Sequence, residues 1–164
     1  NIDAMLALLP IARACSSVLF IVIGSVCDAP GRPTAADCPP NLVMVGRVTD
    51  QELRVWLSAA DVGLNPMISG SGTNLKMLEY AAAGLPILST PFGGRGGVLD
   101  AGVHFEVADI HDFPEALCRI LAPEYQTSRF NMIEAARVCV SERADWRIIA
   151  QRMWQALQVV LSPK

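Results

Sequence analysis

The run from Gly70 to Glu79, GSGTNLKMLE, holds the residues of this chain best suited to bind a ligand. It follows an expected strand and opens an expected helix. A glycine-rich turn lets the backbone approach a phosphate, and a helix N-terminus offers unpaired N–H groups with a partial positive charge. The run therefore predicts an anion site. An ordinary turn with a serine or threonine helix cap would use the same residue types, so that alternative stays open.

Glu79 and Lys76 are the charged residues of the helix that follows the turn. At 100° per residue, Leu75, Leu78 and Ala82 are expected to form its apolar stripe, with both charged residues on the adjacent face. A carboxylate that borders the core needs partners. Glu79 could accept hydrogen bonds from the hydroxyls of a ribose, or it could pair with Lys76. Lys76 could hold a phosphate, or it could lie on a solvated face.

Two other loops follow expected strands and carry candidate residues. Gly46 would let a flat ring approach the backbone, Val48 could pack on that ring, and Arg47 could reach a phosphate. The loop 93–97, GGRGG, contains Arg95. Because the carboxyl ends of parallel strands lie at one rim, we expect all three loops there, where α/β sheets bind ligands. A plain turn and a mobile surface loop are the respective alternatives.

The elements that must position these loops follow from hydrophobic patterning. Strands are expected over 17–24, 41–46, 62–65, 86–90 and 104–107. Helices are expected over 2–14, 49–60, 73–83, 112–122, 124–141 and 145–161. Their alternation predicts an α/β fold, a Rossmann-like doubly wound parallel sheet with a helical C-terminal tail.

Several local signals support these boundaries. The first strand is almost wholly apolar and β-branched, so we expect it to be covered on both faces. Pro10 should kink or break the first helix. Thr49 and Glu52 form a capping box, and Gly84 ends the helix 73–83. The chain opens inside a helical pattern, which suggests a piece of a longer protein.

Composition narrows the function classes. The 164 residues carry a net charge of −3 and are 52% hydrophobic. The scattered basic residues argue against a nucleic-acid partner. The apolar excess suggests a face that meets another domain, while the tryptophans, Trp146 and Trp154 among them, are expected to pack. We expect a cytoplasmic protein, because there are five cysteines with no C-x-x-C spacing, no signal peptide and no membrane span.

The sequence offers no other strong chemical motif. The two histidines, His104 and His111, are isolated from any ligand-like spacing, so no metal site is expected. There is no G-x-G-x-x-G after the first strand and no G-x-x-x-x-G-K-[ST] loop. We identify no catalytic residue.

Two stretches, NLVMVGRVTDQELRVWLSAADVGLNP and GSGTNLKMLEYAAAGLPILST, resemble the C-terminal, donor-binding domain of GT-B fold glycosyltransferases. The likeness is to the retaining family called glycosyl transferases group 1, and it covers nearly the whole chain. It implies one half of a GT-B fold, binding a nucleoside-diphosphate sugar. The reaction implied is transfer of the sugar to an acceptor hydroxyl, with no metal or other cofactor.

The resemblance also implies roles for particular residues. Glu79 corresponds to a glutamate that binds the donor's ribose, the helix start binds the phosphates, and the segment after the second strand lies beside the base. Ser71 stands where the family often carries a first glutamate. The expected donor-binding residues are Gly46, Arg47, Val48, Gly70, Ser71, Gly72, Thr73, Asn74, Leu75, Lys76 and Glu79.

By the same resemblance, residues 1–164 form a single donor-binding domain that lacks its first strand. The N-terminal acceptor domain is absent from this chain, and any peripheral membrane association would arise in that half. Alone, the chain should bind donor weakly and catalyse nothing. Two alternatives remain open: a non-catalytic nucleotide-binding α/β domain and a nucleotide-sugar epimerase of the same fold.

Overall fold

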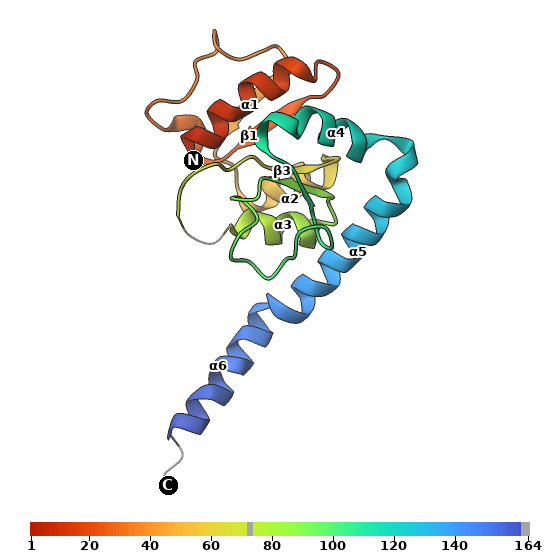
Figure 1. Cartoon of the computed structure of the whole chain (residues 1–164). Helices are drawn as coiled ribbons and strands as arrows, with labels where there is room; N and C mark the ends of the chain where they lie inside the picture. The colour runs from red at the N-terminus through yellow and green to blue at the C-terminus, as the bar shows by residue number, and fades with distance from the viewer. Residues whose placement is uncertain (72–73, 162–164) are drawn as a thin grey trace.

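Parallel strands and helices alternate along the chain in a computed structural model that describes residues 1–71 and 74–161, with only the backbone described for Val159 and Val160 (Figure 1). The described strands are β1 (Phe20–Ile23), β2 (Leu42–Gly46), β3 (Gly63–Asn65), β4 (Ile87–Ser89) and β5 (Glu106–Val107). The described α-helices are α1 (Ile2–Ala14), α2 (Asp50–Ala59), α3 (Leu75–Ala83), α4 (Phe113–Leu121), α5 (Gln126–Arg143) and α6 (Trp146–Leu161). Short 3-10 helices are η1 (Ser25–Asp28), η2 (Ile110–Asp112) and η3 (Pro123–Tyr125). The predicted α/β class and helical tail are confirmed.

The strands form two hydrogen-bonded ladders. β1 pairs in parallel with β2, and β4 lies between β3 and β5 with both pairs parallel. Within the described residues no ladder joins β1 to β3. We call the interruption between these two strands the β1–β3 break. The parallel sheet expected from the sequence is therefore present in two parts.

Helices cover both faces of the second ladder, as in a doubly wound sheet. Leu88 of β4 belongs to a buried cluster that also contains residues of α1 and α4. Its neighbour Ile87 belongs to a second cluster with residues of α3 and α5. Successive residues of a strand face opposite sides, so the alternation places α4 on one side of β4 and α3 with α5 on the other. β4 is buried over its whole length.

The first ladder is less well covered than predicted. Phe20 is the one fully buried residue of β1, and the remaining three are half-buried. The nearby helix α2 has no fully buried residue, although Leu53 and Leu57 are half-buried. The expectation that the first strand is covered on both faces is therefore wrong for this chain. Within the described residues β1 pairs with β2 and with no other strand, and three of its four side chains are partly accessible.

The helix-end signals at Thr49 and Gly84 are confirmed, whereas the break expected at Pro10 is absent. The capping box at α2 is formed: the backbone N–H of Thr49 donates to Glu52 (2.7 Å), and that of Glu52 donates to the Thr49 hydroxyl (3.3 Å). Gly84 ends α3 in the left-handed conformation, with φ +76°. Pro10 does not break α1, which is continuous over residues 2–14. Leu6 is partly exposed, so the carbonyl that loses its N–H partner can reach water.

The last helix carries an uncovered apolar face. α6 extends from the end of α5 away from the body of the molecule (Figure 1). Its large apolar side chains are exposed, and these include Trp146 (80% exposed) and Trp154 (62%). The expectation that these two tryptophans pack within the chain is therefore wrong. No helix in the described part of the chain is both long enough and apolar enough to cross a membrane.

Candidate functional site

The loops that follow β3 and β4 lie against each other at the rim. The Arg95 guanidinium donates from Nη2 to the carbonyl of Gly70 (2.8 Å). The hydroxyl of Thr90 donates to the carbonyl of Met67. These bonds bring the glycine-rich turn and the loop 91–97 together, as their positions after two paired strands predict.

The N-terminus of α3 is not capped by its own N-cap residue. Asn74 occupies that position, and its side chain makes no capping hydrogen bond. Instead its amide donates to the carbonyl of Gly93. The N–H of Met77 reaches the Asn74 carbonyl (3.0 Å), whereas those of Leu75 and Lys76 have no partner within the described residues. No described residue accepts from these two N–H groups, which lie at the positive end of the helix dipole, where anionic ligands bind.

Gly93 fixes the loop 91–97. Its carbonyl accepts from the side-chain amides of both Asn74 and Asn65 (3.0 Å for Asn65), and its N–H donates to the Thr90 hydroxyl (2.8 Å). Asn65 is fully buried, and its Oδ1 has no partner in the described part of the chain. Gly94 packs on Phe105, since an added Cβ would lie 2.5 Å from the ring. The loop is anchored at these points, which argues against the mobile-loop alternative.

The faces of α3 differ from the expected ones. Met77 and Ala81 are buried, whereas Leu75 is 62% exposed and Ala82 is also exposed, so the predicted apolar stripe is wrong. The buried side of α3 differs from the predicted one because the helix packs against α5 as well as the sheet. Glu79 is consequently exposed and does not border the core. This exposure leaves its carboxylate accessible to a ligand.

Lys76 is held in a partly desolvated place. It is half-buried, and burial lowers the pKa of its ammonium group, while the negative charge of Glu79 raises that pKa by a smaller amount. No close ion pair between the two side chains is present, so the i,i+3 pair considered from the sequence is at most a longer-range attraction.

The segment after β2 lies apart from this cluster. Gly46 has φ +88°, a conformation that favours glycine, and its carbonyl accepts from the N–H of Gly24 (2.7 Å). Arg47 forms an exposed ion pair with Asp28 (3.6 Å). Val48 is half-buried. The described contacts do not join this segment to the other two loops, and it belongs to the ladder on the other side of the β1–β3 break.

The sequence-predicted residues therefore fall into three groups. Gly70 and Asn74 are bonded to the loop 91–97, Leu75 and Lys76 follow Asn74 in the first turn of α3, and Ser71 is exposed beside Gly70. Gly46, Arg47 and Val48 stand on the first ladder, and Glu79 lies further along α3. Gly72 and Thr73 lie outside the described residues.

Sequence reasoning missed the residues that hold the glycine-rich turn from the other side. The side-chain amide of Asn1 donates to the carbonyl of Ser69 (2.5 Å), and the Ser69 hydroxyl donates to Asp3. An added Cβ at Gly70 would lie 3.0 Å from the Asn1 amide. Asn1 also caps α1 by accepting from Ala4 (3.3 Å). The helix cap at Asn1 could have been predicted from the sequence. The contact between Asn1 and Ser69 could not, because 68 positions separate the two residues.

Two cavities border these loops. The smaller, about 170 Å³, lies between α3 and the loop 93–99, and Asn74 and Arg95 are part of its lining. The larger, about 400 Å³, is lined by Thr90, Phe92, His111 and their neighbours. Ligand pockets for whole small molecules usually measure about 300–1,000 Å³, so the smaller cavity would take only part of a nucleotide sugar.

Three possible metal ligands come together near the larger cavity, contrary to the expected isolation of His111. Ligand atoms of Asp109, His111 and Asp112 lie within 4.8 Å of one another, and all three residues are exposed. His111 Nε2 is 3.4 Å from Asp112 Oδ1. Exposed clusters of this kind are common without an ion, so the cluster alone defines no metal site.

These features describe an α/β domain with an open helix N-terminus at the rim of a parallel sheet, an arrangement suited to phosphate groups. Residues 1–123 match the protein family described as Glycosyl transferases group 1. The chain belongs to that family. The predicted resemblance and the fold of one half of a GT-B glycosyltransferase are confirmed.

Individual relatives agree with this assignment. The chain is 26% identical, over 95% of its length, to the GDP-mannose-dependent monoacylated alpha-(1-6)-phosphatidylinositol monomannoside mannosyltransferase of Corynebacterium glutamicum. It covers 43% of that protein, so it spans less than half the length of this curated relative.

Solved structures show the same fold. The Anabaena HepE protein in complex with UDP is similar with a TM-score of 0.71 at 18% identity, covering 96% of this chain and 44% of that one. The C-terminal domain of a glycosyl transferase group 1 family protein (LpcC) from Francisella tularensis gives a TM-score of 0.52 at 11% identity, covering 82% of this chain and 92% of that one.

Proposed function

We propose that this chain is the donor-binding half of a glycosyltransferase that moves a sugar from a nucleoside-diphosphate sugar to an acceptor hydroxyl. The observation that carries the proposal is the uncapped N-terminus of α3, whose cap residue Asn74 holds a fixed loop instead. Membership of the family supports it, as do the UDP bound to the HepE protein and the GDP-mannose dependence of the corynebacterial relative.

In this proposal the donor's diphosphate lies at the start of α3. The N–H groups of Leu75 and Lys76, which have no partner among the described residues, donate to its oxygens, and the Lys76 ammonium adds charge. Gly70 and Ser71 begin the glycine-rich segment that lets the phosphates approach, and the sequence predicts that Gly72 and Thr73 also contact them. Helix dipole and cations then offset the charge that develops on the leaving diphosphate, with no metal ion required.

The remaining expected residues contact the nucleoside. Glu79, exposed on α3, accepts from the ribose hydroxyls. Gly46, Arg47 and Val48 lie beside the base, although the β1–β3 break separates them from the phosphate cluster. Closing the site therefore depends on what fills that break.

We further propose that a strand preceding Asn1 lies between β1 and β3. A parallel strand followed by α1 and then β1 makes a right-handed crossover, which places the earlier strand next to β1. The unpaired edge of β1, the half-buried side chains of that strand and the poor cover of α2 all support a strand at this place.

The acceptor would bind to a domain that precedes this strand. Coverage of 43% of the corynebacterial relative leaves room for one, and the exposed apolar face of α6 offers it a surface. Any peripheral membrane contact belongs to that domain in this proposal. The cytoplasm, where we place the protein, supplies nucleoside-diphosphate sugars.

The direct test is nucleotide binding by the full-length protein. UDP, GDP and ADP, and their common sugar conjugates, are titrated by calorimetry against wild type, Glu79→Gln and the matched control Glu142→Gln, an exposed glutamate of α5. One diphosphate should bind, and Glu79→Gln should weaken it about 10- to 100-fold, as expected for hydrogen bonds to a charged group. A 2′,3′-dideoxy nucleotide should lose nothing further in that variant.

Absence of binding by any of these nucleotides would refute the donor site. Conversion of a nucleotide sugar by the full-length protein with no acceptor present would point to an epimerase. Binding without any transfer, across a panel of acceptors, would favour a non-catalytic nucleotide-binding domain.

A further inference from the structure

Arg95 is held in a fixed position over the glycine-rich turn. Its Nη1 donates to the carbonyl of Phe92 (2.5 Å) and its Nη2 to the carbonyl of Gly70 (2.8 Å). The guanidinium also lies over the Phe92 ring, 3.5 Å from the ring centroid. Two backbone oxygens and one aromatic face thus orient this cation between the two rim loops.

The backbone that carries Arg95 is equally constrained. Gly93, two residues earlier, is held by three hydrogen bonds to Asn65, Asn74 and Thr90. Gly94, the residue just before it, packs on the ring of Phe105. The Arg95 side chain is therefore ordered before any ligand binds. Binding then does not incur the entropy cost of ordering a long, flexible residue.

These contacts do not neutralise the positive charge of Arg95. Both oxygen partners are neutral carbonyls, and none of the described ion pairs involves this residue. A guanidinium has five N–H donors, and the described hydrogen bonds occupy two of its nitrogens with one bond each. The residue is exposed, so its side chain is accessible to a ligand from solution.

Arg95 and the open end of α3 border the same cavity. Asn74, the N-cap residue, and Arg95 both line the space of about 170 Å³ between α3 and the loop 93–99. Met77 and Leu99, which also line it, are apolar and buried, whereas Arg95 is exposed. A charged group is therefore expected beside Arg95 and Asn74 rather than beside the buried apolar residues of the lining.

We propose that Arg95 binds the diphosphate of the donor from the side opposite α3. The assignment rests on the proposed function and adds a second cationic arm to it. The planar guanidinium presents paired donors that match two phosphate oxygens, a geometry that the single ammonium of Lys76 does not offer. Phe92 and the Gly70 carbonyl keep the donors aimed at the site before the ligand binds.

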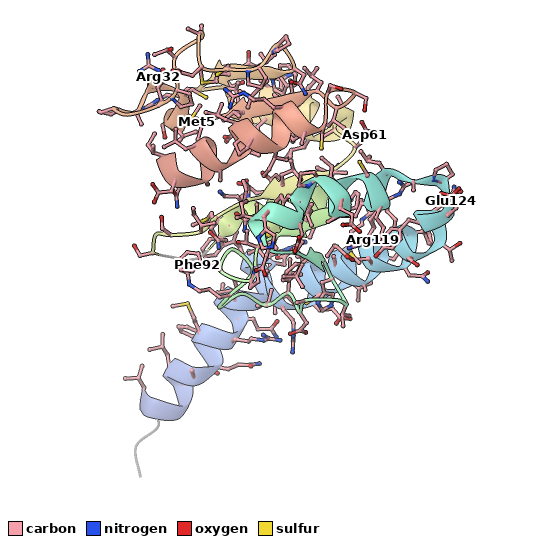
Figure 2. The ribbon with its side chains drawn as sticks, turned by 45° about the horizontal axis from the view of Figure 1, so that its top comes forward. Met5, Arg32, Asp61, Phe92, Arg119 and Glu124 are labelled. Carbon is pink, nitrogen blue, oxygen red and sulfur yellow. The ribbon has the colours of Figure 1, made fainter. Side chains whose placement is uncertain are left out.

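The experiment compares ligands that differ only in phosphate number. The full-length protein is titrated with UDP or GDP, whichever binds wild type, and with the matching nucleoside monophosphate and nucleoside. The variants are Arg95→Gln, Arg95→Lys and Arg32→Gln. Arg32 is an exposed arginine in the loop between β1 and β2, on the other side of α1 from Phe92 (Figure 2).

Arg95→Gln should weaken the diphosphate roughly 10- to 100-fold and leave the nucleoside unchanged, because hydrogen bonds to charged groups have that size. Arg95→Lys should recover part of the loss, and Arg32→Gln should bind as wild type does. Affinity for the diphosphate should also depend less on salt concentration in Arg95→Gln.

Equal losses for diphosphate and nucleoside would show that Arg95 only supports the loop, and no loss would overturn the assignment while the proposed function stands. A wild-type protein that binds none of the diphosphates would overturn both. Phe92→Leu is a second test that does not depend on the folding of Arg95→Gln. This variant removes the aromatic ring but keeps the Arg95 charge and both carbonyl partners, so its diphosphate affinity should fall less than that of Arg95→Gln.

Discussion

The side-chain amide of Asn74 donates to the carbonyl of Gly93 and makes no capping hydrogen bond to the first turn of α3. Asparagine is among the preferred N-cap residues, so the N–H groups could have been satisfied locally. The structure uses this residue to join two loops instead. An anionic ligand is the partner that this end of the helix favours.

Replacing Asn74 by aspartate should separate stability from binding. A carboxylate cannot donate to Gly93, but it can cap the free N–H groups and favours the positive end of the helix dipole. The lost bond and the gained cap each contribute about 1 kcal/mol, so the free energy of unfolding should change little. Diphosphate affinity, measured by calorimetry, should fall at least about tenfold because the acid occupies and repels the phosphate position.

Asn74→Ala is the matched control for that variant. It loses the bond to Gly93 without adding a cap or a charge, so it should be the less stable of the two, with Tm lowered by about 2–4 °C. Its diphosphate affinity should lie between those of wild type and Asn74→Asp. If Asn74→Asp bound diphosphate as tightly as wild type does, the start of α3 would not be the phosphate site.

Gly63→Ala should destabilise the domain through one contact. A Cβ at this position of β3 would lie 2.5 Å from the ring of Tyr80, and the site is buried. Overpacking of this kind costs about 1–3 kcal/mol. Urea unfolding should show the loss, whereas Gly97→Ala should stay within about 0.5 kcal/mol, because its nearest neighbour would be 3.9 Å away. Equal stability of the two variants would mean that α3 shifts freely over β3.

Tyr80 should make stability fall at alkaline pH. Burial, and to a smaller extent the Glu79 carboxylate, raises the pKa of Tyr80 from 10.0 to about 12. The folded state then keeps a proton that the unfolded state has lost, so the contribution is complete below pH 10 and disappears as pH rises through 12. A shift of this size corresponds to about 2–3 kcal/mol.

The measurement is the urea midpoint of wild type and Tyr80→Phe over that pH window. Phenylalanine keeps the ring beside Gly63 and removes the titrating hydroxyl, so the variant should lose less stability as pH rises. Lys76 acts in the opposite direction, since burial lowers its pKa and stability recovers as it deprotonates. Parallel curves for the two proteins would contradict the burial of the Tyr80 hydroxyl.

The exposed face of α6 should become covered in the full-length protein. Trp154→Gln removes an exposed side chain from the 164-residue chain and should change its stability by less than about 0.5 kcal/mol. In the full-length protein the same change should cost more than about 1 kcal/mol, since a buried aromatic is lost. Acrylamide quenching of tryptophan fluorescence provides an independent check: Trp146 and Trp154 should be less accessible in the longer chain. Equal quenching in both would place the partner of this chain elsewhere.

Much of the fold could be predicted because its signals are local. The capping box at Thr49, the left-handed Gly84 and the alternation of elements depend on residues within a few positions of each other. The glycine-rich turn was placed correctly between a strand and a helix for the same reason. Its role in binding remains a prediction.

What sequence reasoning missed depends on contacts between distant segments. The register of α3 was misjudged because Leu75 and Met77 are both apolar, and only packing against α5 decides which is buried. The hydrogen bonds from Arg95 to Gly70 and from Asn1 to Ser69 join segments that are distant in the sequence. No local sequence pattern predicts them. Trp146 and Trp154 are expected to pack because tryptophan usually does, and within the described residues nothing covers them.

The β1–β3 break has a consequence for how the domain opens. Side-chain packing, through the cluster shared by α1, β1, β4 and α4, holds the two halves together where backbone bonds do not. Amide hydrogen exchange should therefore reveal two cooperative units, with β1 and β2 exchanging at a lower opening free energy than β3 and β4. The loops around Arg95 belong to the second unit, so the phosphate end of the site would stay folded when the unit of β1 and β2 opens locally.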